Sequence, residues 1–201
     1  MKKFTKFTST VVPVPLRDVD TDLIVPAQFL TTVTKDGLAQ ALFKRLRDND
    51  PQFSLNQEKF KSAEILVVDS NFGCGSSREH AVWAIVSYGF RVVIAKSFAD
   101  IFYNNSAKNG LLLVTLNEQV VDKLLKDSET GNCKVEVDLE KQTVVLPDGS
   151  EHSFNYDPFR KHCLLNGLED LDYILSHQEQ IDEYRKKNAD KKFFSTLEAN
   201  N

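Results

Sequence analysis

The chain has 201 residues, of which 41% are hydrophobic and 27% are charged, and its formal net charge is −4. This composition is ordinary for a globular protein, and a chain of this length buries roughly 70% of its unfolded surface without help from a metal or disulfide. We therefore expect a single domain over residues 1–201. The acidic balance excludes a basic surface for nucleic acid or for an anionic membrane.

The N-terminal residues and the cysteines bear on cellular location. The first lysines precede no uninterrupted apolar run, so no signal peptide is predicted, and the longest apolar run is far shorter than the ~18 residues of a membrane span. Cys74, Cys133 and Cys163 are odd in number and lack paired spacing, which fits a reducing cytoplasm. Without a CxxC or clustered His/Cys pattern, this chain is expected to bind no metal or iron–sulfur cluster itself.

The first third of the chain predicts irregular structure around two short strands. Residues 9–16 and 22–27 are strand-like, with prolines typical of edges or strand ends, and an acidic turn lies between them. One helix is expected around Leu38–Leu46, within a polar stretch that runs to residue 62. A long irregular insertion of this kind in a compact domain usually has a function.

The middle of the chain alternates strands with helices. Strands are expected at residues 63–70, 90–97 and 111–116, and helices at residues 78–89, 98–110 and 118–128. Short β-branched runs between amphipathic segments indicate a parallel sheet with crossover helices.

The last third departs from this alternation. Residues 133–157 alternate apolar and polar positions around the turn sequence "LPDGS", which indicates antiparallel strands. A helical extension is expected over about residues 158–190, before a frayed tail at 190–201. One apolar face of that extension would comprise Leu171, Ile174, Leu175, Ile181 and Tyr184.

The segment "NFGCGSSREH", residues 71–80, has two interpretations. Ser76 and Glu79 match a capping box, and Gly73 and Gly75 allow a turn with positive φ. That interpretation leaves Arg78 unexplained, because a cation is disfavoured near a helix N-terminus. Alternatively, free backbone N–H groups and the Arg78 guanidinium would bind a small carboxylate. The glycine spacing matches neither the dinucleotide fingerprint nor a Walker A loop, which disfavours a nucleotide-binding domain.

Three stretches carry a family resemblance in the same order along the chain. They are "VDTDLIVPAQFL" at residues 19–30, the long run from "NFGCGSSREH" to "NNSAKNGLL" at 71–112, and "FRKHCLLNGL" at 159–168. Together they strongly resemble the small-subunit family of bacterial 3-isopropylmalate dehydratases, within the aconitase superfamily. The resemblance implies an α/β fold, the swivelling β/β/α domain of the aconitase type, with a mixed sheet and flanking helices.

The resemblance also implies a partner and a reaction. The family's 4Fe-4S cluster belongs to a separate large subunit, with which this chain would form a heterodimer or larger assembly. The substrate would be a small dicarboxylate, 2-isopropylmalate, isomerised to 3-isopropylmalate through an alkene in leucine biosynthesis. Ser76 would act as the base, Ser77 and Arg78 would hold the substrate carboxylate, and the partner's iron would accept the leaving hydroxyl as a Lewis acid.

Two weaker patterns lie earlier in the chain. Residues 28–37 match the family's specificity loop, in which Leu30 would contact the isopropyl group and Thr31 would replace the basic residue of relatives with a further substrate carboxylate. A plain core or loop role for Leu30 stays open. The acidic turn with Asp18, Asp20 and Asp22 could bind a hard metal, but capping of the next segment is the favoured interpretation, because a calcium loop's glycine and distal glutamate are missing.

Alternative functions remain at this stage. Within the same chemistry, the chain could serve a homoaconitase or a citraconate/citramalate hydratase. From another class, it could be a non-catalytic carboxylate-binding module that uses the same helix start.

Overall fold

The computed structural model describes residues 1–30, 37–75 and 78–188. Its strands are β1 (Phe7–Val14), β2 (Ile65–Val68), β3 (Val92–Ala95), β4 (Leu112–Thr115), β5 (Lys134–Asp138), β6 (Thr143–Val145) and β7 (Glu151–Ser153). Its α-helices are α1 (Thr21–Ile24), α2 (Lys44–Asn49), α3 (His80–Tyr88), α4 (Asp100–Lys108), α5 (Glu118–Ser128), α6 (Pro158–Asn166), α7 (Asp170–Ser176) and α8 (Gln178–Lys187). No helix in these ranges is long and apolar enough to cross a membrane.

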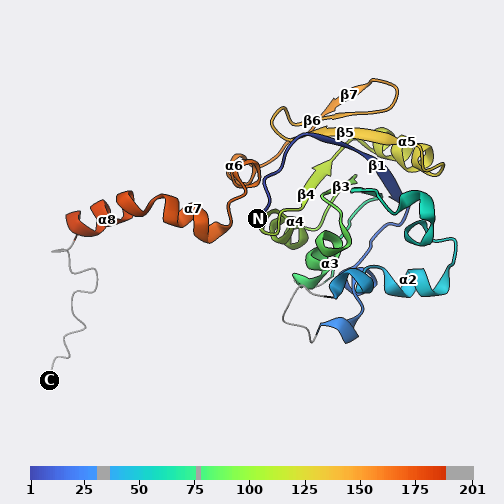
Figure 1. Ribbon diagram of the computed structural model, residues 1–201, viewed down its shortest axis with the longest axis horizontal. Coiled ribbons are helices and arrows are strands. Elements are labelled where there is room, and N and C mark those ends of the chain that lie inside the picture. Colours follow the sequence, from blue (N-terminus) through green and yellow to red (C-terminus); the bar gives the residue numbers. More distant parts are fainter. Residues whose placement is uncertain (31–36, 76–77, 189–201) are drawn as a thin grey trace.

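The strands form one mixed sheet in the order β4-β3-β2-β1-β5-β6-β7 (Figure 1). The first four positions pair in parallel, with Val11 opposite Ile65 and Val92 opposite Leu112. From β1 onward the pairing is antiparallel, with Phe7 opposite Val137. The expected parallel half and the expected antiparallel half are therefore confirmed, and β1 joins them.

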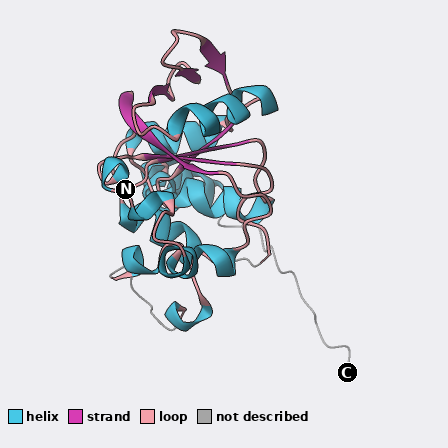
Figure 2. Cartoon of the chain, turned by 90° about the vertical axis from the view of Figure 1, so that its right-hand side faces the viewer, coloured by secondary structure: helices cyan, strands magenta, loops and turns pink. Residues whose placement is uncertain are grey.

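Helices cover both faces of the parallel half (Figure 2). Alternate residues of each strand enter different cores: Val12 and Leu66 lie in a core with α3, whereas Val11 and Ile65 lie in a core with α5. Burial on both faces explains why these strands read as continuous apolar runs. The loops that follow β1 and β2, at the carboxyl ends of these neighbouring parallel strands, carry the candidate site.

Two local predictions are wrong. Residues 22–27 do not form a strand: Asp20 accepts a hydrogen bond from Leu23 N at 2.7 Å and caps the short helix α1. The helix expected around Leu38–Leu46 is broken, because Phe43 has a φ of 49° between a 3-10 turn at Leu38–Ala41 and α2. In both cases a tertiary contact outweighs the local pattern, since Ile24 and Phe43 are fully buried.

The last two helices form an arm that projects from the body of the molecule (Figure 1). Helix α6 packs on the body, where Cys163 and Leu164 are buried. Neither α7 nor α8 contains a buried residue. The helical extension is therefore present, but its apolar face is directed away from the core.

Candidate active site

Two loops meet at the carboxyl ends of β1 and β2. Because these neighbouring strands are parallel, the loop after β1 and the loop after β2 leave the same edge of the sheet. Hydrogen bonds join them along their length: Asp18 N to Ser70 O at 3.0 Å, Gly73 N to Val19 O at 2.8 Å and Thr21 N to Cys74 O at 3.0 Å. The acidic turn and the glycine-rich segment, far apart in sequence, thus form one structure.

Both glycines of the segment have the positive φ expected from the sequence, +79° at Gly73 and +91° at Gly75. Gly73 is also a point of close approach, since a Cβ atom there would lie 2.2 Å from Cγ of Phe102. Asp18 and Asn71 also adopt positive φ, at 51° and 55°, and Asn71 Nδ2 donates to Asp18 Oδ1 at 2.8 Å. Backbone held in this uncommon region often marks a functional site.

The Arg78 guanidinium forms an ion pair with Asp22. Arg78 follows the β2 loop and Asp22 follows the β1 loop, so the pair spans the seam between them. Its side chains are one-third to one-half exposed, at 33% for Arg78 and 46% for Asp22. A guanidinium has five N–H donors, so Arg78 can keep this carboxylate while it binds a second one. Sequence reasoning considered Asp22 only as part of a metal site or of a capping turn, and gave it no role beside Arg78.

The capping box predicted from Ser76 and Glu79 is wrong. Helix α3 begins at His80, and Glu79 occupies the N-cap position rather than the third helical position. The Glu79 side chain turns to the end of α4, where its Oε1 accepts from Asn109 Nδ2 at 2.6 Å, and Trp83 Nε1 donates to Asn109 Oδ1 at 2.9 Å. Arg78 therefore precedes the helix, which weakens the expected conflict with the helix dipole.

The acidic turn supports the capping interpretation. Asp20 caps α1, and Asp18 binds Asn71, so both carboxylates have structural partners. Within the described residues no group of three or more His, Cys, Asp or Glu side chains could hold a metal ion. Burial, then Asp20 and Asp18, raise the pKa of the Cys74 thiol. A thiol with a raised pKa is a poor nucleophile and a poor metal ligand, consistent with a loop role for Cys74.

The remaining predicted site residues divide into two groups. Ser76, Ser77 and Thr31 lie outside the described residues. Leu30 ends a 3-10 turn at Ala27–Phe29 and is a partly buried side chain that packs against the core containing α3. The structure thus shows a packing role for Leu30, and its contact with the substrate stays a prediction.

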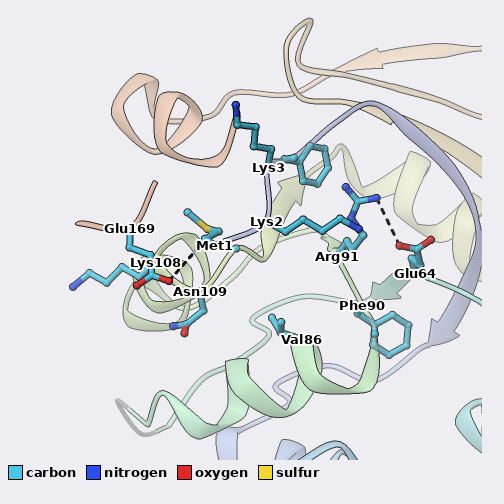
Figure 3. Close-up of a pocket in the computed structure, with 13 residues that line it drawn as sticks. Met1, Lys2, Lys3, Glu64, Val86, Phe90, Arg91, Lys108, Asn109 and Glu169 are labelled. Atoms are coloured by element: carbon cyan, nitrogen blue, oxygen red, sulfur yellow. Dashed lines mark hydrogen bonds and ion pairs between the residues drawn. The ribbon is translucent and has the colours of Figure 1, made fainter. Parts of the chain in front are cut away.

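A separate cavity of about 420 Å³ lies among the N-terminal residues, Arg91, Lys108 and Glu169 (Figure 3). None of its lining residues belongs to the loops at 17–22 or 70–78. Within it the N-terminal ammonium of Met1 pairs with Glu169 at 3.3 Å, and Arg91 pairs with Glu64 at 3.7 Å. This cavity is bounded by structural ion pairs, so the loop seam with Arg78 remains the candidate site.

Comparison with known proteins places the chain in a family. A model described as the aconitase C-terminal domain matches residues 1–119, and one described as LeuD_N matches residues 122–158. The 3-isopropylmalate dehydratase small subunit of Francisella philomiragia is 49% identical over 186 residues, covering 92% of this chain and 98% of that protein. The small subunit of Paramagnetospirillum magneticum is 51% identical over 187 residues, covering 90% and 93%. The chain belongs to the 3-isopropylmalate dehydratase small-subunit family.

A solved structure agrees with this membership. The crystal structure of 3-isopropylmalate dehydratase (leuD) from Methanocaldococcus jannaschii is 29% identical, with a TM-score of 0.67, and the match covers 90% of this chain and 99% of that one. The aconitase-type fold expected from the resemblance is confirmed. The seam between the two loops remains the candidate active site of this chain.

Proposed function

We propose that this chain is the small subunit of 3-isopropylmalate dehydratase, a hydro-lyase of leucine biosynthesis that acts with a large subunit. Support comes from relatives of that name at 49–51% identity over most of the chain. The observation that carries the proposal is the Arg78–Asp22 pair, which holds a guanidinium at the loop seam beside the "GSSR" sequence. A fixed guanidinium is the side chain best suited to a substrate carboxylate.

Proton removal is assigned to Ser76. A serine hydroxyl is barely acidic near neutral pH, so its alkoxide needs fixed positive charge in a site shielded from water. Arg78, two residues away in sequence, would supply that charge, and Ser77 would share the substrate carboxylate with Arg78. Helix α3 begins at His80 with Glu79 at its N-cap position, so the proposed base is not the residue that directly precedes the helix.

The iron–sulfur cluster is assigned to the large subunit, because this chain's cysteines do not suit one. A cluster needs several converging thiolates. Cys133 and Cys163 are buried at 4% and 3% exposure in the body of the fold, and Cys74 alone lies at the loop seam. The active enzyme would thus be a heterodimer or larger assembly. We place it in the cytoplasm, where three cysteines without a disulfide are stable.

Substrate choice is assigned to residues 28–37. Leu30 would face the isopropyl group, and Thr31 offers no cation for an additional substrate carboxylate. Burying an unpaired carboxylate is costly, so an apolar contact there favours isopropylmalate over homoaconitate. A citraconate hydratase would need only a smaller apolar contact, which makes it the second candidate.

The deciding variant is Ser76→Ala in the complex reconstituted with the large subunit. We expect turnover on isopropylmalate to fall by about 10²–10⁴-fold, because the general base is lost, while the melting temperature stays close to that of the parent. Turnover and melting are measured on the same preparations, with homoisocitrate and citraconate as comparison substrates.

Ser54→Ala is the matched control, since Ser54 lies in a 3-10 turn that belongs to neither loop. Near-normal isomerisation by the Ser76 variant would reject the assigned base. Carboxylate binding without turnover by the parent complex would instead favour the non-catalytic binding module.

A further inference from the structure

The arm formed by α7 and α8 exposes apolar side chains that nothing within the described chain covers. Leu171, Ile174, Leu175 and Tyr184 are 65%, 53%, 55% and 61% exposed. Leu171, Ile174 and Leu175 follow the i, i+3, i+4 spacing of one helix face, and Ile181 and Tyr184 extend that pattern along α8. We call these five residues the arm stripe. The stripe is interrupted at His177 between the two helices, and Ile181 is only partly exposed. Exposed apolar side chains gathered on one element in this way mark an interaction site.

The arm's root is fixed to the body. Asp170 accepts from Arg160 at 2.8 Å and lies 3.8 Å from Lys108, and Glu169 pairs with the N-terminal ammonium (Figure 3). The Tyr173 ring packs edge-on against Phe159 of α6, with centroids 4.7 Å apart. These contacts use the inner side of α7, so the arm stripe is held facing outward.

The helices themselves are too short to be stable in water without a partner. Helix α7 has 7 residues and α8 has 10, and neither buries a residue. Isolated helices below ~12–15 residues are marginal, and most helical stability comes from packing an apolar face. The arm is therefore built to pack against another chain.

The position and the charge of the arm indicate which partner chain packs against it. Lys108, which holds the root, is followed by Asn109, and Asn109 binds Glu79 next to Arg78. The root thus adjoins the segment that the large subunit must cover to complete the proposed site. Residues 169–187 contain six Asp or Glu, all before Tyr184, and three Lys or Arg, all in the last turn of α8, so the arm carries a net charge of −3. The complementary surface is an apolar groove with a basic rim.

We propose that the arm stripe docks as a helix into an apolar, Lys/Arg-rimmed groove of the large subunit and fastens the two subunits together. This proposal rests on the proposed function, because that function supplies the large subunit. Docking by the arm would add contacts beyond those around the site itself.

The test is Leu175→Glu in the full chain, with Ser176→Glu as control. The two positions are adjacent and exposed and receive the same charge, but Ser176 lies off the arm stripe and bonds only within the arm, to Tyr173 O and His177. Titration with the large subunit should show a Kd about 10- to 100-fold higher for Leu175→Glu and little changed for Ser176→Glu. Saturating large subunit should restore the parent turnover, since the arm does not touch the reacting groups.

An unchanged Kd for Leu175→Glu, with both variants melting like the parent, would overturn the proposal. So would sedimentation showing that the variant abolishes self-association of the small subunit while its Kd for the large subunit is kept, since the stripe would then pair with a second copy. Failure of the proposed function looks different: the parent chain itself would bind no large subunit or give no isomerisation.

Discussion

At the residue scale, the candidate site depends on a few side chains with several partners each. Arg78 is paired with Asp22, and the neighbouring Glu79 is bound by Asn109, so the peptide between them is held from both sides. Asp20 caps helix α1, and Asp18 accepts a hydrogen bond from the Asn71 side chain. Only Asp22 among the three acids of the turn contacts the arginine, which gives it a distinct role.

Asp22→Asn tests that role. The amide keeps the shape of the side chain but removes the charge that orients Arg78, so we expect kcat/KM of the complex to fall about tenfold, equivalent to about 1.4 kcal/mol. Because the pair is partly exposed, the free energy of unfolding should change by less than about 1 kcal/mol.

Asp18→Asn is the matched control for that variant. Asn tolerates the positive φ at position 18, and the parent carboxylate contacts Asn71 rather than Arg78. Equal losses of kcat/KM in the two variants would show that the turn acts only through general charge.

Gly73→Ala tests the close approach of the loop to α4. The new methyl group would meet Phe102, which is 2% exposed and has no room to move, at a backbone φ of +79°. We expect a loss of about 2 kcal/mol or more in the free energy of unfolding, measured by denaturant titration. Gly149→Ala has a similar φ of +83° with nothing within 4 Å, so it should cost only about 1 kcal/mol. Equal costs would remove the steric explanation.

At the element scale, the site is held by ties between strand ends. Lys96 follows β3, and its ammonium lies 3.1 Å from Asp69, which follows β2, and 2.6 Å from Asp122 on α5. Asn71 N also donates to Ser97 Oγ at 2.8 Å. These contacts hold Asp69 and Asn71, at the start of the glycine-rich loop, against the residues that follow β3. The start of the loop is therefore fixed to the sheet.

The Asp69–Lys96 ion pair predicts that the stability of the fold depends on pH. Burial is the largest single influence on Asp69 and opposes its ionisation, but the hydrogen bond and charge of Lys96, together with hydrogen bonds from Ser70, outweigh burial and hold the pKa of that carboxyl below its ordinary 3.8. A lowered folded-state pKa contributes stability above the ordinary pKa, and this contribution is lost as pH falls through the folded value. The stability difference between the parent and Asp69→Asn should therefore shrink below about pH 4.

Denaturant unfolding at pH 6, 5, 4 and 3 measures this difference. Lys96→Met removes the partner of Asp69 instead. The difference in free energy of unfolding between the parent and Lys96→Met should also shrink as the pH falls over that range. A difference that stays constant down to pH 3 would contradict the assignment.

At the scale of the whole molecule, one sheet supports two surfaces with different purposes. The loops after β1 and β2 carry the Arg78 seam. The helices α7 and α8, which project from the body of the molecule (Figure 1), carry the arm stripe. In the two proposals made above, a second chain would exclude water from the seam and would cover the apolar side chains of the arm stripe. A division of one enzyme into two subunits accounts for both.

The sequence by itself determined the order of strands and helices from residue 63 onward, the parallel and antiparallel halves, the positive φ of Gly73 and Gly75, and the family. These features depend on residues close together in the chain or on motifs read in order. Helix α5 was expected at residues 118–128 and occupies Glu118–Ser128, because its apolar spacing and its Asn117 cap are local signals.

Only the tertiary structure decided the rest. The Arg78–Asp22 pair joins residues 56 positions apart, Glu79 turns to Asn109 instead of closing a capping box, and residues 21–24 coil into a helix between two loops. Likewise, a stripe such as Leu171, Ile174 and Leu175 has the same spacing whether it faces a core or solvent. Contacts between distant segments set these outcomes, and local propensities are too weak to oppose them.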